Sequence, residues 1–99
     1  MRDLLRAMEE YAAMHTVPVI GHDSAELLLA ALAARDPVEI LEIGTAIGYS
    51  TLMIAEKMSG AARITTIEAD PVRAAAARDF FARARIAGRI DLLVGDAAE

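Results

Sequence analysis

The stretch LEIGTAIGYST, residues 41–51, departs from the amphipathic pattern around it. A mostly apolar run that carries one acid, Glu42, meets Gly44, and Gly48 follows four residues later. The hydroxyl-rich segment YST, residues 49–51, comes next. Glycine lets a backbone turn tightly and approach a ligand closely, because it has no Cβ. The stretch therefore predicts a buried strand, a tight glycine turn and the start of a helix.

Strand-like and helix-like segments alternate outward from this stretch, and their order predicts an α/β fold. Strands are expected at 38–43, 63–68 and 90–94, with helices at about 48–58 and 71–88 between them. The first of these helices is expected to stop at Ser59-Gly60, and Asp70 is expected to cap the second. This order implies parallel strands joined by right-handed crossovers, which is half of a doubly wound sheet. Both crossovers run in the same direction, so both helices are expected on one face.

Two more helices are expected before the first strand, over residues 2–15 and from Asp23 to the segment RDP at 35–37. Asp23 and Glu26 form a capping-box variant, and Pro18 and Gly21 make the segment between the helices extended. The chain then reads as one domain, 1–99, with N-terminal helices over 1–37 and a βαβαβ core over 38–99. Side chains at helical spacing predict the buried positions. In the three longer helices these are Leu4, Leu5, Met8, Tyr11 and Ala12; Leu27, Leu28, Ala31 and Leu32; and Val72, Ala76, Phe80 and Ala84.

Composition narrows the class of protein. The chain has 99 residues, of which 56% are hydrophobic, and no cysteine, so disulfides and thiolate metal sites are excluded. A net charge of −5 argues against nucleic-acid binding by this chain alone. No signal-peptide pattern is present, and no apolar run approaches the ~20 residues of a membrane span. We therefore expect a cytoplasmic protein that does not bind a membrane.

Three turns are expected to meet at the carboxyl ends of the strands, where open α/β sheets bind ligands. They are Gly44–Gly48, Glu68–Asp70 and Gly95–Ala97. The amides at the start of the helix after Gly48 suit a carboxylate. Glu68 can accept hydrogen bonds from the two hydroxyls of a ribose, and Asp96 can accept one from an exocyclic amine such as that of adenine.

Plainer interpretations exist for most of these residues. The two glycines alone are also typical of an ordinary strand-to-helix turn, and Asp70 is better explained as a helix cap. His15 and His22 have no partner at metal-ligand spacing, so they are expected to be solvent-facing. Ser50 has no neighbouring histidine and is not a nucleophile candidate. The arginines of the last helix and the turn after it are spread around the helix, which favours solvated ion pairs over a basic patch; they are Arg73, Arg78, Arg83, Arg85 and Arg89.

The motifs ILEIGTAIGYST, ITTIEADP and IDLLVGDAAE resemble the first three motifs of class I S-adenosylmethionine-dependent methyltransferases. The closer resemblance is to the catechol and caffeoyl-CoA type of O-methyltransferase, with its E-[IL]-G-x-x-x-G-Y-S pattern. The segment YAAMHTVPVIGHDSAELL also looks like bacterial members, including the branch that methylates 5-hydroxyuridine in tRNA. The resemblance implies S-adenosylmethionine (SAM) as the cofactor, with no metal held by this chain.

The same resemblance assigns roles within the cofactor site. Gly44 and Gly48 would back the methionine part, with Ala46 between them where many members have glycine. Ser50 and the Tyr49 backbone would bind the methionine carboxylate, and Glu42 would face the ammonium group. Glu68 would bind the ribose, and Asp96 and Ala97 would flank the adenine. Val17 would lie near the methyl group.

Family members are roughly twice as long, and their metal-binding aspartates and catalytic residues follow a fourth strand. The resemblance therefore implies the cofactor-binding N-terminal half of an O-methyltransferase, catalytically silent as this chain. A nicotinamide dinucleotide module is an alternative, but it needs the pattern G-x-G-x-x-G, whereas this turn has glycines at 44 and 48 only.

A self-associating half-fold without ligand function is a further alternative. In the family the strand order is 3-2-1 and strand one pairs with strand four, so here the edge of strand one would be free. The helices between the strands can cover only one face of the sheet. The other face could be covered only by the N-terminal helix or by a second copy of the chain. We expect a homodimer, formed through the strand-one edge, through the uncovered face or by exchange of N-terminal helices.

Overall fold

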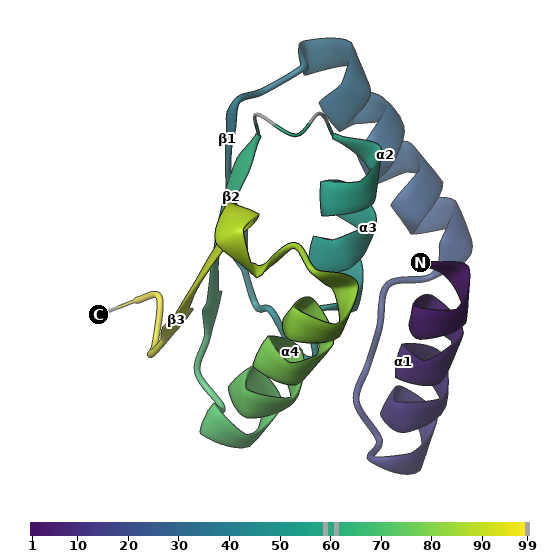
Figure 1. Cartoon of the computed structure of the whole chain (residues 1–99), viewed down its shortest axis with the longest axis vertical. Coiled ribbons are helices and arrows are strands. Elements are labelled where there is room, and N and C mark those ends of the chain that lie inside the picture. Colours follow the sequence, from purple (N-terminus) through teal and green to yellow (C-terminus); the bar gives the residue numbers. More distant parts are fainter. Residues whose placement is uncertain (59, 61, 99) are drawn as a thin grey trace.

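The structure, a computed structural model, describes residues 1–58, 60 and 62–98. Its elements in chain order are α1 (Arg2–Met14), α2 (His22–Arg35), β1 (Glu39–Ile43), α3 (Tyr49–Lys57), β2 (Arg63–Glu68), α4 (Pro71–Ala84), the 3₁₀ turn η1 (Ala87–Arg89) and β3 (Ile90–Val94) (Figure 1). The predicted bounds of β2 and β3 are confirmed. Those of α1, β1 and α3 differ by one residue at one or both ends. Ser59, at the expected stop of α3, lies outside the described residues.

The strands form a parallel sheet in the order β1-β2-β3. This is the predicted order 3-2-1, counted from the opposite edge of the sheet, and the prediction is confirmed. Glu39 of β1 lies opposite Arg63, and the pairing runs in step to Ile43 opposite Ile67. β3 pairs with the other edge of β2 in the same parallel sense. The strands therefore all end at the same edge of the sheet, where the ligand site is predicted.

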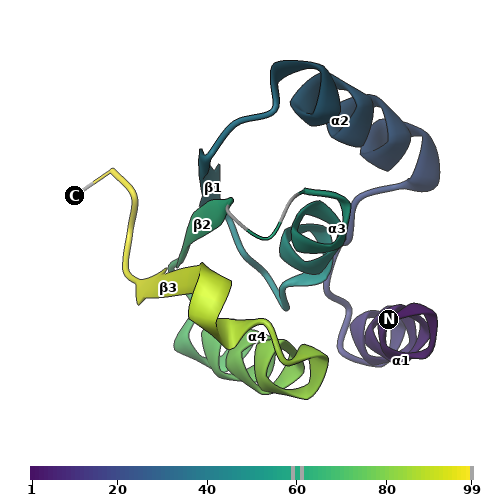
Figure 2. The same ribbon diagram turned by 45° about the horizontal axis from the view of Figure 1, so that its top comes forward.

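All the helices lie on one side of the sheet (Figure 2). This confirms that α3 and α4 share a face, as two right-handed crossovers in one direction require. Side chains on that face are buried, among them Ile64 of β2, Leu52 of α3 and Phe81 of α4. The core of the domain is therefore a single layer between sheet and helices.

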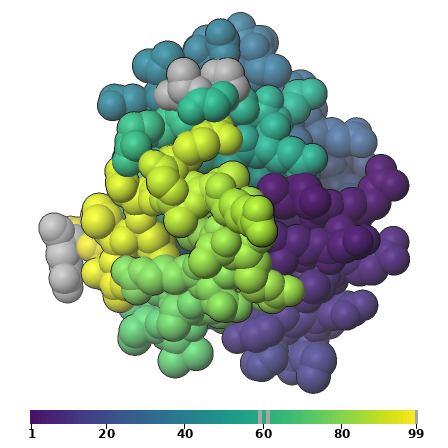
Figure 3. All heavy atoms as spheres, viewed as in Figure 1, coloured from purple at the N-terminus to yellow at the C-terminus, as the bar shows by residue number. Residues whose placement is uncertain are grey.

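The N-terminal helix α1 packs on the outer side of this helical layer. Its Met8 and Ala12 are buried in the common core, and α1 lies alongside α3 and α4 (Figure 3). Helix α1 therefore does not cover the second face of the sheet. The expectation that the N-terminal helix could cover this face was wrong.

The second face is open in the part of the chain that the structure describes. Leu41 is 63% exposed, Ile43 is 68% exposed and Leu93 is 53% exposed, although all three lie within strands. Strand residues alternate between faces, so these side chains point away from the helices. The sheet is covered on one face only.

Helix α2 differs from its prediction at its start and on its buried face. It begins at His22 with Gly21 as N-cap, so Asp23 lies in the first turn and makes no capping bond. Leu27 is 77% exposed and Leu28 is 37% exposed, whereas Ala25 is buried. The helix is apolar around most of its circumference, so spacing alone cannot choose the face that packs on α3.

The start of α4 confirms its prediction, whereas its buried stripe and end do not. Asp70 Oδ1 accepts a hydrogen bond of 2.8 Å from the Val72 amide, as an N-cap should. Val72 itself is 72% exposed, and Ala74, Ala77 and Phe81 are buried in addition to Phe80. The helix ends with Arg85 in the left-handed conformation at φ 61°, not at Gly88.

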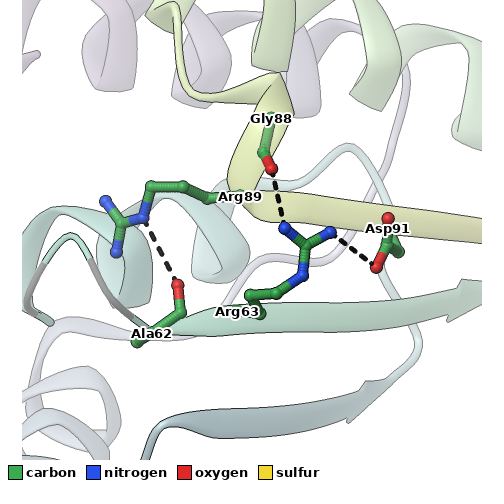
Figure 4. Close-up of polar contacts among 5 residues, drawn as sticks. All are labelled: Ala62, Arg63, Gly88, Arg89 and Asp91. Carbon is green, nitrogen blue, oxygen red and sulfur yellow. Dashed lines mark hydrogen bonds and ion pairs between the residues drawn. The ribbon is translucent and has the colours of Figure 1, made fainter.

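Two of the five arginines, Arg73 and Arg83, confirm the expectation of ion pairs, whereas Arg78 and Arg89 donate to backbone carbonyl oxygens. Arg73 pairs with Asp70, and Arg83 pairs with Asp79. Arg89 instead donates hydrogen bonds to carbonyl oxygens that end α3 and precede β2. Figure 4 shows the bond to Ala62 (3.4 Å), and the other acceptors are Ala55 (3.0 Å) and Met58 (3.5 Å). Arg89 therefore caps the C-terminus of α3, a position where a cation is favourable.

A second arginine stabilises the amino end of the sheet. Arg63 donates to the Gly88 carbonyl at 3.1 Å and pairs with Asp91 at 3.0 Å (Figure 4). Both side chains of the ion pair are about half exposed, so its contribution to stability is small, roughly 0–1 kcal/mol.

Candidate functional site

The turn between β1 and α3 is held by main-chain hydrogen bonds and by left-handed residues. Gly44 has φ 89°, Ala46 has φ 50° and Gly48 has φ 90°. The amides of Gly44 and Thr45 both donate to the Ile67 carbonyl, at 2.8 and 3.2 Å. The turn is thereby attached to the end of β2.

The Glu68 carboxylate fixes the same turn from the side of β2. Its Oε1 accepts a hydrogen bond of 2.7 Å from the Ala46 amide, and its Oε2 accepts one of 3.0 Å from the Asp70 amide. Glu68 is only 8% exposed. Its carboxylate therefore links the first and second turns at the carboxyl edge, which brings two of the three predicted turns together.

Glu42 is the centre of a hydroxyl network. It accepts hydrogen bonds from Ser50 (2.6 Å), Thr66 (2.8 Å) and Thr51. Thr45 and Thr66 join their hydroxyls at 2.6 Å. The network ties β1, β2 and the start of α3 into one unit and fixes the direction of the Glu42 carboxylate.

The threonines of this network were not among the predicted site residues. Thr45, Thr51 and Thr66 are each at most 1% exposed. In the sequence they resemble ordinary strand and turn residues, since threonine is common in strands. One signal in the sequence could have identified Thr66. In the strand segment RITTIE, this position is expected to face the core, where an apolar residue is usual and a hydroxyl is not.

Two cavities flank Gly44. The first, the Ser50 cavity, has a volume of about 210 Å³ and lies between the connector after α1 and the glycine turn; its lining residues are Pro18, Val19, Ile20, Gly44, Thr45, Ala46, Tyr49 and Ser50. The second, the Asp96 cavity, has a volume of about 190 Å³ and lies over the ends of all three strands; its lining residues are Ile43, Gly44, Ile67, Glu68, Ala69, Gly95, Asp96 and Ala97.

Gly44 is the lining residue that the two cavities share. A Cβ built on Gly44 would meet no heavy atom of the described residues within 4 Å. The space beside the Gly44 backbone is therefore open and is not filled by a packed neighbour. An extended ligand could pass over Gly44 from one cavity to the other.

Tyr49 lines the Ser50 cavity and connects it to α1. Its hydroxyl donates a hydrogen bond of 2.7 Å to Glu9 Oε2, and the residue is 6% exposed. Burial, then the hydrogen bond and the negative charge of Glu9, raise the pKa of Tyr49 to about 12. Tyr49 is therefore neutral at physiological pH and serves to position α1 against α3.

The other predicted site residues fall into two groups. Asp96 and Ala97 line a cavity as expected, and Asp96 Oδ1 also accepts a hydrogen bond of 2.9 Å from the Ala98 amide. Val17 is buried in the core, and its amide donates to the Ala12 carbonyl. It is not a lining residue of either cavity, whereas Val19 and Ile20 of the same connector line the Ser50 cavity.

The described residues contain no group of three or more histidine, cysteine, aspartate or glutamate side chains placed to hold a metal ion. His15 donates a hydrogen bond of 2.9 Å from Nδ1 to the Tyr11 carbonyl and stacks on the Tyr11 ring. That histidine therefore has a local structural role.

Comparison with known proteins connects this geometry to a chemistry. The family model described as O-methyltransferase matches residues 1–99. The chain is 38% identical over 73 residues to a catechol O-methyltransferase of Mycobacterium tuberculosis, which covers 74% of this chain and 32% of that protein. It is 36% identical over 89 residues to a transmembrane O-methyltransferase of Propithecus coquereli, covering 86% of this chain and 30% of that protein.

Among solved structures, the chain is similar to an O-methyltransferase from Bacillus cereus in complex with SAH (S-adenosylhomocysteine). The TM-score is 0.86 at 28% identity, and the match covers 97% of this chain and 44% of that one. The chain thus spans about a third of the length of the curated relatives it matches. Within the described residues, no helix is long and apolar enough to cross a membrane.

Proposed function

The chain belongs to the O-methyltransferase family, and we propose that it binds SAM at the carboxyl edge of its sheet, across Gly44. The observation that carries this proposal is the position of Gly44 as the shared wall of the Ser50 cavity and the Asp96 cavity. The amino-acid part of SAM would occupy the first cavity and the nucleoside part the second. The match to an enzyme solved with SAH supports this cofactor.

The hydrogen-bond capacity of the two glutamates suits this ligand. A carboxylate has about four acceptor sites. Glu42 uses three of them on Ser50, Thr51 and Thr66, which leaves one for an ammonium group. Glu68 uses two on backbone amides, which leaves two for the neighbouring hydroxyls of a ribose.

The methionine carboxylate would lie at the start of α3, beside Ser50 and the Tyr49 amide. The positive end of the helix dipole favours a negative group there. In the second cavity, Asp96 and Ala97 would flank the adenine. Asp96 Oδ1 accepts a hydrogen bond from the Ala98 amide, which restrains the carboxylate that would accept from the exocyclic amine.

Methyl transfer itself is not expected from these 99 residues alone. Removal of a proton from an acceptor hydroxyl needs a base or a metal. The carboxylates of Glu42 and Glu68 are engaged by hydroxyl and amide donors, and Tyr49 is neutral. Incubation with SAM, a catechol and magnesium should therefore give no methylated product above a protein-free blank.

Calorimetric titration of the chain with SAH tests the proposal, with NADH titrated in parallel. We expect saturable binding of SAH and none of NADH. Absence of SAH binding at millimolar ligand would refute the proposed site, and tighter binding of NADH would favour the dinucleotide alternative.

A further inference from the structure

The two oxygens of the Glu42 carboxylate have different partners. Oε1 accepts hydrogen bonds from Thr51 and from Thr66 (2.8 Å), whereas Oε2 accepts one from Ser50 (2.6 Å). We propose that the core holds Oε1 with and without ligand, whereas Ser50 gives up Oε2 to the ligand's ammonium group and then donates to the ligand's carboxylate. This exchange presupposes SAM binding as proposed above, and it makes Ser50 the residue that selects an α-amino acid head group.

The donors to Oε1 lie in the core. Thr51 and Thr66 are both 0% exposed, and neither lines the Ser50 cavity. Thr66 has one hydroxyl hydrogen and gives it to Glu42, so the hydrogen in its 2.6 Å contact with Thr45 comes from Thr45. The bonds therefore run in one direction, from Thr45 through Thr66 to Oε1, and each polarises the next. A carboxylate oxygen with two donors has no acceptor site left.

Ser50 differs from these threonines because a ligand can reach it. It is half-buried and lines the Ser50 cavity. Its hydroxyl is the donor to Oε2, and that oxygen keeps one acceptor site for a further donor. Of the three hydroxyls bonded to Glu42, that of Ser50 is therefore the one that a ligand in this cavity can engage.

A count of hydrogens shows why binding must change this contact. A serine hydroxyl has one hydrogen, and here it points to Oε2. The Ser50 oxygen would therefore present only lone pairs to a ligand carboxylate at the start of α3. If the hydroxyl turned toward that carboxylate with no ammonium group present, Oε2 of the half-buried Glu42 would lose its donor, which is costly.

An ammonium group removes this cost. It carries three donors and a positive charge, so it can pair with Oε2 through a charge-assisted hydrogen bond. The Ser50 hydrogen can then turn to the ligand carboxylate, which also meets the free amides at the start of α3. The two charged groups of the head group are thus recognised together, and each strengthens the binding of the other by the same factor.

Calorimetric titration with four ligands tests the exchange. The ligands are SAH, its analogue without the amino group, its analogue without the carboxylate, and 5′-propylthioadenosine, which lacks both groups. For the wild type, the product of the two single losses in affinity should exceed the loss caused by removing both groups, by at least about fivefold. Ser50→Ala should reduce this factor to about twofold or less. Ser24→Ala, on the exposed side of α2, is the matched control and should keep it.

Substitutions at Thr66 test the hold on Oε1. Thr66→Val removes the hydroxyl at nearly the same volume, so the Glu42 carboxylate is no longer fixed in direction. SAH affinity should fall at least about threefold, whereas affinity for 5′-propylthioadenosine should not change. Thr66→Ser keeps a hydroxyl and should restore SAH affinity. Thr65→Val, on the opposite face of β2, is the matched control and should alter neither affinity.

Amide spectra establish that each variant is folded. An equal coupling factor in the wild type and Ser50→Ala, or no coupling in the wild type, would overturn the exchange while the cofactor site stands. An equal loss of SAH and 5′-propylthioadenosine binding in Thr66→Val would show that Thr66 is structural only and would overturn the hold on Oε1. A wild type that binds none of the four ligands would refute the proposed function, and the exchange with it.

Discussion

Gly44 and Gly48 have almost the same backbone conformation but opposite surroundings. Their φ angles are 89° and 90°. A Cβ at Gly48 would lie 2.5 Å from Phe81 Cε1 and 2.8 Å from Phe81 Cζ, whereas a Cβ at Gly44 would meet no described atom within 4 Å. One glycine is required by the core and the other faces open space.

This difference separates packing from ligand recognition within one turn. Gly48 allows α4 to approach the start of α3, so any side chain there displaces an aromatic ring. Gly44 leaves its space empty between two cavities, so a side chain there would compete with a ligand and not with the fold. Substitution at the two positions should therefore affect different measurements.

The largest effect is expected from Gly48→Val. A branched side chain would clash with Phe81 and would also occupy a backbone region that β-branched residues avoid. Urea unfolding should show a loss of at least about 3 kcal/mol. Gly44→Ala is the matched control and should lose only about 1–2 kcal/mol, because it adds backbone strain without a clash. Equal losses at both positions would contradict the contrast.

Glu42→Ala should give the next largest loss of stability. It removes the acceptor shared by Ser50, Thr51 and Thr66, and two of these hydroxyls are buried. Leaving buried donors unsatisfied costs roughly 1–3 kcal/mol. Denaturation of Glu42→Ala beside Glu39→Ala, an exposed acid on the same strand, measures this. A similar midpoint for both variants would show that the network is dispensable.

Tyr49→Phe should change the pH dependence of stability. The folded-state pKa of about 12 lies above the unfolded value near 10, so the contribution is complete below pH 10 and is lost as pH rises toward 12. The loss at pH 12 should be about 2 kcal/mol. The difference in unfolding free energy between wild type and Tyr49→Phe should shrink over this window. A difference that is constant with pH would contradict the assigned pKa.

The smallest effect is expected from Arg83→Ala. Its partner Asp79 is exposed, the ion pair spans 4.0 Å, and Arg83 is not a lining residue of either cavity. Stability should change by less than about 1 kcal/mol, and ligand affinity should not change. A loss of affinity would extend the site onto α4.

Periodicity and turn chemistry predicted most of the fold. The strand segments RITTIE and IDLLV are bounded by turn residues, and Asp70-Pro71 is a strong helix start, so their bounds were confirmed. Helix α2 was harder, because the run AELLLAALAA offers apolar residues on every side, and only tertiary packing left Leu27 exposed. The free sheet face follows from topology, but the sequence could not show that α1 packs outside the helical layer.

The candidate site was predictable where it depended on glycines and acids. It was not predictable where it depended on hydroxyl partners, because nothing in local spacing brings Thr66 to Glu42 or Thr45. Nor could spacing distinguish Gly44 from Gly48. That distinction depends on Phe81, more than thirty residues away in the chain.

Amide chemical shifts during an SAH titration, recorded for the wild type and for folded Gly44→Ala, test the central claim most directly. We predict that shifts in the wild type concentrate at residues 44–50, 68–70 and 95–98, and that Gly44→Ala weakens binding at least tenfold while remaining folded. Shifts elsewhere, or equal affinity in both proteins, would show that the space beside Gly44 is not the cofactor site.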